Sequence, residues 1–321
     1  MKNKVNWKNA LIDSIQTEME LKPFTDQLKT SQTRSNFPLK IPRQFAEKID
    51  PGNPDDPILL QISKPLTVEK EGFSDDPVGD HLAYKEAGIL HKYKNRLLLI
   101  LTGHCAIHCQ YCFRQNYSYQ DSKIDFKFLD AIKSYIEKNP QINEIILSGG
   151  DPLSLSNQQL DKLFRFIDQL SQIKITRIHS RFPVVIPDRL DDEFLNIIDA
   201  HKKQIVFVFH INHANEIDAH FRDQISKLKK RNVHLLNQSV LLSKINDSAV
   251  ILIDLSYKLF EYGIIPYYLH QLDRVTGAEA FEVEIERGLQ IIDEMKRELP
   301  GYLVPRYVKE IAGEPYKTIL V

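Results

Sequence analysis

The residues best suited to chemistry are three cysteines, Cys105, Cys109 and Cys112, the only cysteines in the chain. They form a C-x3-C-x2-C pattern directly after an apolar stretch. Three thiolates bind three of the four irons of a cubane cluster and leave the fourth iron open to a chelating substrate. The pattern therefore predicts a [4Fe-4S] cluster whose open iron binds a small molecule through amino and carboxylate groups, as S-adenosylmethionine can.

A structural zinc site is the alternative interpretation of the same segment, with His104 or His108 completing a Cys3His set. Structural zinc usually takes its ligands from two separated pairs, and the sequence has no second pair of cysteines. A zinc-binding protein without enzymatic activity stays open at this point. Disulfides are not expected, because three closely spaced cysteines are poorly placed to staple a chain of 321 residues.

The composition argues against two classes of partner. The 42 basic and 43 acidic side chains nearly cancel, so no overall charge attracts nucleic acid or an anionic membrane surface. The longest aliphatic run covers only residues 97–101, and the amino terminus lacks an apolar signal core. We therefore expect no nucleic-acid partner, no membrane partner and a cytoplasmic location.

Short β-rich stretches alternate with segments of helical period after residue 95. Strands are expected at residues 96–102, 144–147, 174–179, 204–210, 233–237 and 265–270. Helices are expected between them, as at residues 157–170, 216–231 and 248–262. This alternation predicts an α/β fold with a parallel sheet, a partial (β/α)6 barrel rather than a closed eight-stranded one. The chemistry is then expected in the loops that follow the strands.

Three regions are expected along the chain. Residues 1–95 form a mainly helical and irregular accessory region, with a helical stretch at 10–21 and a segment rich in Pro and Asp at 50–77. Residues 96–300 form the partial barrel, and residues 301–321 form a C-terminal segment.

The cysteine pattern resembles the signature of the radical S-adenosylmethionine enzymes. Ser148, Gly149, Gly150 and Asp151 resemble the glycine-rich loop of that superfamily, in which small residues let the backbone approach the bound cofactor. Tyr111 lies just before the third cysteine, where the superfamily commonly places an aromatic ring against the adenine. The resemblance implies that all five residues contact S-adenosylmethionine.

Further segments resemble the lysine 2,3-aminomutases within that superfamily, namely residues 76–81, 180–185, 212–216, 237–242 and 266–268. Agreement in the same order along the chain is more specific than any single motif. The resemblance implies a second cofactor, pyridoxal phosphate, bound as a Schiff base by Lys317. Arg96 and Lys92 match basic positions near the coenzyme phosphate, and Arg181 and Gln238 lie in matched segments as further cofactor contacts.

The same resemblance implies how a substrate is bound. Arg114 matches the arginine that binds the substrate carboxylate, a task suited to a bidentate guanidinium. Asp273 and Glu310 match two acidic residues that bind the ε-ammonium of lysine, although the family usually has Asp at the position of Glu310. His270 stands where the family has a Tyr near the coenzyme.

The sequence is most similar to the short members of the family. It ends four residues after Lys317 and has no further cysteines, so neither the C-terminal extension nor the extra metal site of the long catabolic enzymes is expected. The resemblance implies conversion of (S)-α-lysine to (R)-β-lysine, which a separate ligase attaches to elongation factor P, and an external electron donor. The alternatives are an aminomutase for glutamate or ornithine, and an inactive fold that only binds elongation factor P or its ligase.

Overall fold

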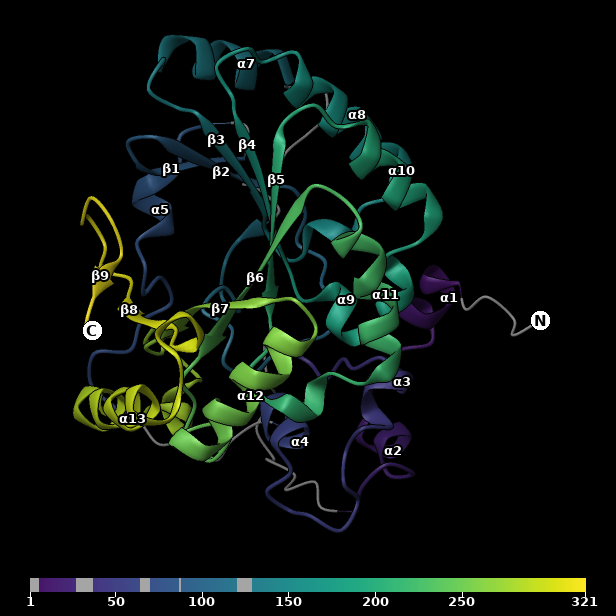
Figure 1. The fold of residues 1–321 in the computed structure, drawn as a ribbon, viewed down its shortest axis with the longest axis vertical. Helices are drawn as coiled ribbons and strands as arrows, with labels where there is room; N and C mark the ends of the chain where they lie inside the picture. Colours follow the sequence, from purple (N-terminus) through teal and green to yellow (C-terminus); the bar gives the residue numbers. More distant parts are fainter. Residues whose placement is uncertain (1–5, 27–36, 64–69, 87, 120–128) are drawn as a thin grey trace.

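A single nine-stranded sheet forms the centre of the molecule (Figure 1). The computed structural model describes residues 6–26, 37–63, 70–86, 88–119 and 129–321. Strands pair in chain order; β2 to β8 are parallel, and β1 and β9 are antiparallel to their neighbours at the two ends of the order. The strands are β1 Ile89–Tyr93, β2 Arg96–Ile100, β3 Glu144–Ser148, β4 Ile175–Ser180, β5 Gln204–His210, β6 Val233–Val240, β7 Ile265–His270, β8 Arg306–Lys309 and β9 Thr318–Ile319.

All six expected strands are confirmed as β2 to β7, and the open parallel sheet confirms the partial barrel. The structure adds β8 as one more parallel strand, with Tyr268 of β7 paired to Arg306. Two of the four residues of β8 are basic, so no apolar run marked this strand in the sequence. Its position matters because it brings the C-terminal segment against the sheet.

Helices cover the outside of the curved sheet (Figure 1). Their apolar residues recur at helical spacing, as in α8, where Leu160, Leu163, Phe164 and Ile167 are all buried. The helices that follow the strands are α7 Leu129–Lys138, α8 Asn157–Asp168, α9 Phe182–Val185, α10 Asp192–Ala200, α11 Ala219–Lys229, α12 Ala249–Glu261 and α13 Ile285–Glu298. No helix in the described ranges has the length and apolar character needed to cross a membrane.

The accessory region packs on the barrel as short pieces rather than as one long helix. The stretch expected at residues 10–21 is two helices, because a capping box between Thr17 and Glu20 starts a new one and Ile15 pairs with Ile41 in a β-bridge. Buried side chains of this region belong to the same hydrophobic core as those of the barrel. The short helices are α1 Trp7–Ile12, α2 Glu18–Leu21, α3 Arg43–Ala46, α4 Pro57–Ile62 and α5 Asp80–Ala83.

Candidate active site

A cavity of about 380 Å³ lies among β2 to β7 and the loops that follow them. Every cysteine, cofactor contact and substrate contact expected from the sequence lines this one cavity. The three thiols are free and half-buried. A concave site with a few convergent polar groups is the usual form of a ligand-binding site, so the expected residues meet where a ligand can reach them.

The cysteine loop follows β2 and is held from outside the barrel by the accessory region. Lys40 donates its Nζ to the carbonyl oxygen of Cys105 at 2.8 Å and accepts a backbone hydrogen bond from His108 at 3.0 Å. Gln61 of α4 accepts another from Gln110 at 2.9 Å. The imidazole of His108, one of the two candidates for a fourth zinc ligand, is hydrogen-bonded through its Nδ1 to the carbonyl oxygen of Pro38 at 2.8 Å.

The donor set of the loop fits an iron–sulfur cluster. Burial raises the pKa of Cys105 well above its usual value and that of Cys112 to about 11, which favours the protonated thiols unless bound cations stabilise the thiolates. In the described ranges no group of three His, Cys, Asp or Glu residues is placed around a single metal ion. In a cubane each thiolate binds a different iron.

The glycine pair after β3 packs directly on the cysteine loop. Gly149 has φ +121°, and a Cβ on it would lie 2.6 Å from the carbonyl oxygen of Thr102. A Cβ on Gly150 would lie 2.6 Å from the carbonyl oxygen of His104. Any side chain here would push the two loops apart, because real Cβ atoms do not approach backbone oxygens this closely. Gly149 and Gly150 therefore present only backbone atoms to the cavity, next to Ser148.

Asp151 ties the glycine loop to the next loop of the barrel. One carboxylate oxygen accepts from the hydroxyl of Ser180 at 2.8 Å, and the other accepts from the backbone amides of Arg181 at 2.8 Å and Phe182 at 3.0 Å. Burial raises the pKa of Asp151 to about 6 despite these bonds. Its oxygens are thus occupied by protein donors, and its assignment as a direct cofactor contact stays a prediction.

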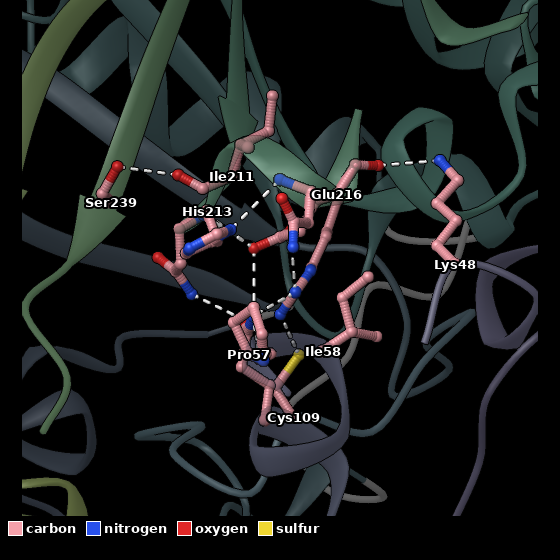
Figure 2. Close-up of polar contacts among 12 residues, drawn as sticks. Lys48, Pro57, Ile58, Cys109, Ile211, His213, Glu216 and Ser239 are labelled. Carbon is pink, nitrogen blue, oxygen red and sulfur yellow. Dashed lines mark hydrogen bonds and ion pairs between the residues drawn. The ribbon is translucent and has the colours of Figure 1, made fainter. Parts of the chain in front are cut away.

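A buried polar network, which we call the cluster-end network, reaches the sulfur of Cys109 at its edge (Figure 2). Arg181 donates to the Sγ of Cys109 at 2.7 Å and to the carboxylate of Glu216 at 2.9 Å. It also donates to Gln61 at 2.7 Å and to the hydroxyl of Tyr111. Glu216 is fully buried, and its other oxygen accepts from the amides of Asn212, His213 and Gln61. Arg181 therefore links a cluster ligand to the accessory region.

A second set of ionic contacts, the charge chain, runs along another part of the cavity. It alternates in sign through Arg114, Asp80, Lys92, Glu310 and Lys317. Asp80 pairs with Arg114 at 2.7 Å and with Lys92 at 2.7 Å, and Lys92 lies 3.5 Å from Glu310. The last contact joins Glu310 to the Nζ of Lys317. The loop between β8 and β9 carries Lys317 into this position.

Asp273 lies just after β7 and is half-buried at the cavity. The pKa of its carboxyl group is raised to about 7, mainly by burial; Glu310 and Asp80 also raise it, whereas Lys317 and Lys92 lower it. Glu310 behaves oppositely, because Lys317 and Lys92 hold its pKa near 2 despite burial. Of the two carboxylates expected to bind a substrate ammonium, Asp273 is the one not already paired with a lysine among the described residues.

The remaining expected contacts lie on strand ends around the same space. Arg96 is half-buried and stacks 4.1 Å over the ring of Tyr93, leaving Arg96 better placed than the doubly paired Lys92 for a phosphate. Gln238 is hydrogen-bonded to the Nε2 of His210 at 2.8 Å. The Nε2 atoms of His179 and His270 are buried and have no partner in the described structure. Such unpartnered polar atoms fit a ligand that brings its own donors and acceptors.

Sequence reasoning did not single out several of these groups. Polar lining residues to which it assigned no individual role include Asp80, Tyr93, Arg177, His179, His210, Asn212, Tyr267 and Tyr268. Burial lowers the pKa of His210 to about 3 and that of His179 below its usual value, so both are neutral. The sequence did contain a pattern that indicates two of these residues. Arg177 and His179 are two positions apart on β4, so their side chains point to the same face of the strand.

Comparisons with known proteins show what this chain is similar to. Residues 95–241 match the family described as a 4Fe-4S single cluster domain. The L-lysine 2,3-aminomutase of Haemophilus influenzae is 43% identical over 98% of this chain and 95% of its own. That of Escherichia coli is 43% identical over 88% and 83%, and that of Acetoanaerobium sticklandii is 31% identical over 98% and 77%. A solved structure of anSMEcpe with bound AdoMet and a peptide covers 64% of this chain and 59% of its own at a TM-score of 0.47 and 12% identity.

An iron–sulfur domain with three cysteines at the edge of an open α/β barrel defines an enzyme of the radical S-adenosylmethionine class. Within that class, the chain belongs to the L-lysine 2,3-aminomutase family, whose members are isomerases. The matched domain confirms the expected [4Fe-4S] cluster, and membership in the aminomutase family supports the expected S-adenosylmethionine and pyridoxal phosphate.

Proposed function

We propose that this chain isomerises (S)-α-lysine to (R)-β-lysine. The supporting observation is that a single cavity collects three thiols, Lys317, a guanidinium at Arg114 and an unpaired carboxylate at Asp273. An α-amino acid with a distal amine carries the complementary groups. Glutamate has a carboxylate at that distal position. The carboxylate of Asp273 would repel it, whereas it attracts the ammonium of lysine.

The proposed roles follow from the contacts of each side chain. Cys105, Cys109 and Cys112 hold the cluster, and the backbone at Gly149 and Gly150 makes room for the amino acid end of S-adenosylmethionine. When bound, S-adenosylmethionine at the cluster supplies a carbon radical and pyridoxal phosphate spreads unpaired spin over its ring. Burial of the surrounding residues excludes water, which keeps a reactive radical next to its target.

Lys317 is the proposed covalent anchor of pyridoxal phosphate, with Arg96 as a phosphate contact. Glu310 bonds the Nζ of Lys317, but a carboxylate with a pKa near 2 is a poor proton acceptor. We therefore assign Glu310 to positioning Nζ rather than to deprotonating it. Glu310 becomes available to a substrate ammonium only when Nζ is withdrawn, so Asp273 is the primary contact for the ε-ammonium.

The product is proposed to serve elongation factor P, to which a separate ligase attaches it. The support is the resemblance to the short members of the family, and a cytoplasmic location and an external electron donor belong to the same proposal. Supplying the product to the ligase and elongation factor P should then add one β-lysyl group to that protein, as measured by mass spectrometry of the intact chain.

The decisive experiment is anaerobic incubation of the reconstituted, reduced protein with L-lysine, pyridoxal phosphate and S-adenosylmethionine. Chiral chromatography should detect (R)-β-lysine, and parallel incubations with ornithine and glutamate should give much less product. Cleavage of S-adenosylmethionine without β-lysine would overturn the substrate assignment and keep the radical chemistry. Preference for ornithine would move the assignment to that substrate.

A further inference from the structure

The segment at residues 76–81 is matched to the family but has no role in the assignments above. In the structure it is a preorganised turn that starts α5. Gly79 adopts the left-handed conformation with φ 67°, and the carboxylate of Asp76 accepts from the amides of Asp80 at 2.8 Å and His81 at 3.0 Å. A Cβ on Gly79 would lie 2.9 Å from the Cβ of Ala312, so this turn packs against the segment that carries Lys317.

The turn places the carboxylate of Asp80 between two cations of the cavity. Asp80 is 1% exposed, and its Oδ2 accepts from the Nε of Arg114 at 2.7 Å. Its Oδ1 lies 2.7 Å from the Nζ of Lys92. Arg114 and Lys92 together hold the pKa of Asp80 near 2 despite its burial, so the group is an anion at any working pH.

These contacts determine which atoms of Arg114 face the cavity. Its Nε is held by Asp80 and its Nη1 by the hydroxyl of Ser148 at 3.3 Å. Within the described ranges Nη2 makes no hydrogen bond to protein, and Arg114 lines the cavity. A guanidinium fixed at two nitrogens has lost most of its rotational freedom, so less entropy is lost when it binds a carboxylate.

The other partner of Asp80 extends the contact toward Lys317. Lys92 donates to the carbonyl oxygen of Val78 at 2.8 Å and lies beside Glu310, which bonds Lys317. A buried ion pair is weak evidence for stability by itself, because its desolvation offsets its attraction. Here both cations that Asp80 holds line the ligand cavity, which points to a role in binding rather than in folding alone.

We propose that Asp80 is a positioning residue for substrate recognition, which aims Arg114 at the carboxylate of the amino acid substrate and holds Lys92 beside Glu310. The accessory region therefore supplies part of the active site, beyond covering the barrel. This inference rests on the proposed function, because it assumes that Arg114 binds the substrate carboxylate.

The test is the variant Asp80→Asn, which keeps the shape of the side chain and removes its charge. The KM for lysine should rise by about tenfold to a hundredfold, the range of one charge-assisted hydrogen bond, while kcat changes less. Iron content and cleavage of S-adenosylmethionine without lysine should stay as in the wild type. Asp75→Asn is the matched control, because Asp75 lies in the same turn and its contact is an exposed one with Asn116 at 2.9 Å.

Lysine amide separates positioning from general damage, because it lacks the carboxylate. As a competitive inhibitor it should bind Asp80→Asn as well as it binds the wild type, while lysine binds the variant more weakly. Equal weakening for both ligands, or an unchanged KM for lysine, overturns the inference. If Asp80→Asn does not fold, Asp80→Glu decides, since it keeps the charge but displaces Arg114; an unchanged KM there overturns the inference too. Absence of β-lysine from the wild type would instead overturn the proposed function.

Discussion

Two buried arginine–carboxylate pairs lie at the cavity, and they differ in the groups that satisfy the rest of each carboxylate. Arg181 lies 2.9 Å from Glu216 in the cluster-end network, and Arg114 lies 2.7 Å from Asp80 in the charge chain. Both carboxylates are almost completely buried. The remaining acceptor sites of Glu216 are filled by neutral amide donors, whereas those of Asp80 face a second cation, Lys92.

This difference indicates a structural role for the cluster-end network and a ligand-binding role for the charge chain. The buried carboxylate of the cluster-end network is satisfied by protein groups, and the network reaches the cluster ligands through the N–H that Arg181 donates to Cys109. The charge chain stays open, because its three cations outnumber its two carboxylates and its last member is Lys317. An excess of positive charge suits anionic ligands such as a phosphate and a carboxylate. The end of the cavity with the cluster-end network is therefore closed by protein groups, whereas the end with the charge chain keeps an excess of positive charge.

Lys317→Ala is expected to have the largest effect on turnover. It tests whether the charge chain can be disrupted without loss of the iron–sulfur cluster at the other end of the cavity. Turnover should fall on the order of 10³-fold or more, because the proposed anchor of the coenzyme is gone. Borohydride treatment of the wild type should fix pyridoxal phosphate to the peptide containing Lys317, as seen by mass spectrometry, and the variant should lose that label. Iron content should not change, since no contact of the cluster-end network passes through Lys317.

Lys309→Ala is the control for that experiment, because Lys309 lies on β8 near Lys317 and does not line the cavity. It should keep the label and the activity. A label that persists in Lys317→Ala, or moves to Lys92, would show that the anchor is a different lysine. Loss of iron in Lys317→Ala would contradict the separation of the two ends.

Local sequence patterns were enough to predict the parallel sheet and the cysteine and glycine loops at the ends of its strands. The strands at β2 to β7 carry apolar runs bounded by polar loops, and such runs are visible without knowing their partners. The cysteine spacing and the pair Gly149 and Gly150 are likewise local, so their place after β2 and β3 followed from the order of the elements. The strand β8 was missed because its four residues include two basic ones.

The pairings within the site could not be predicted, because tertiary structure decides them. Lys92 and Glu310 are 218 positions apart, and Arg181 and Cys109 are 72 apart. Nothing near Glu310 in sequence distinguishes a substrate contact from the partner of Lys317. The roles assigned to the site residues stay predictions until variants test them, whereas their convergence on one cavity is a property of the fold.

Arg181→Met and Arg114→Met compare the two pairs directly through stability. Arg181→Met leaves Glu216 buried without a cation and should lower the free energy of unfolding by ~3–5 kcal/mol. Arg114→Met leaves Asp80 paired with Lys92 and should cost less, ~1–3 kcal/mol. Anaerobic urea unfolding of the reconstituted variants measures both. Adding Glu216→Gln to Arg181→Met should recover part of the lost free energy of unfolding, because it removes the unpaired charge. Equal losses in Arg181→Met and Arg114→Met would contradict the distinction between the cluster-end network and the charge chain.

The smallest expected effect concerns the open end and is a dependence on pH. Asp80 and Glu310 have pKa values near 2 and stay ionised, whereas burial raises the pKa of Asp273 to about 7. Only the ionised form of Asp273 attracts an ammonium, so the KM for lysine should rise as pH falls below about 7, by up to about tenfold per unit. Asp273→Asn should raise the KM and flatten this limb, while the control Asp254→Asn, at an exposed position of α12, should keep it. If the KM of Asp273→Asn still rises as pH falls, another group is responsible for the titration. The charge chain would then be the binding site for the ammonium.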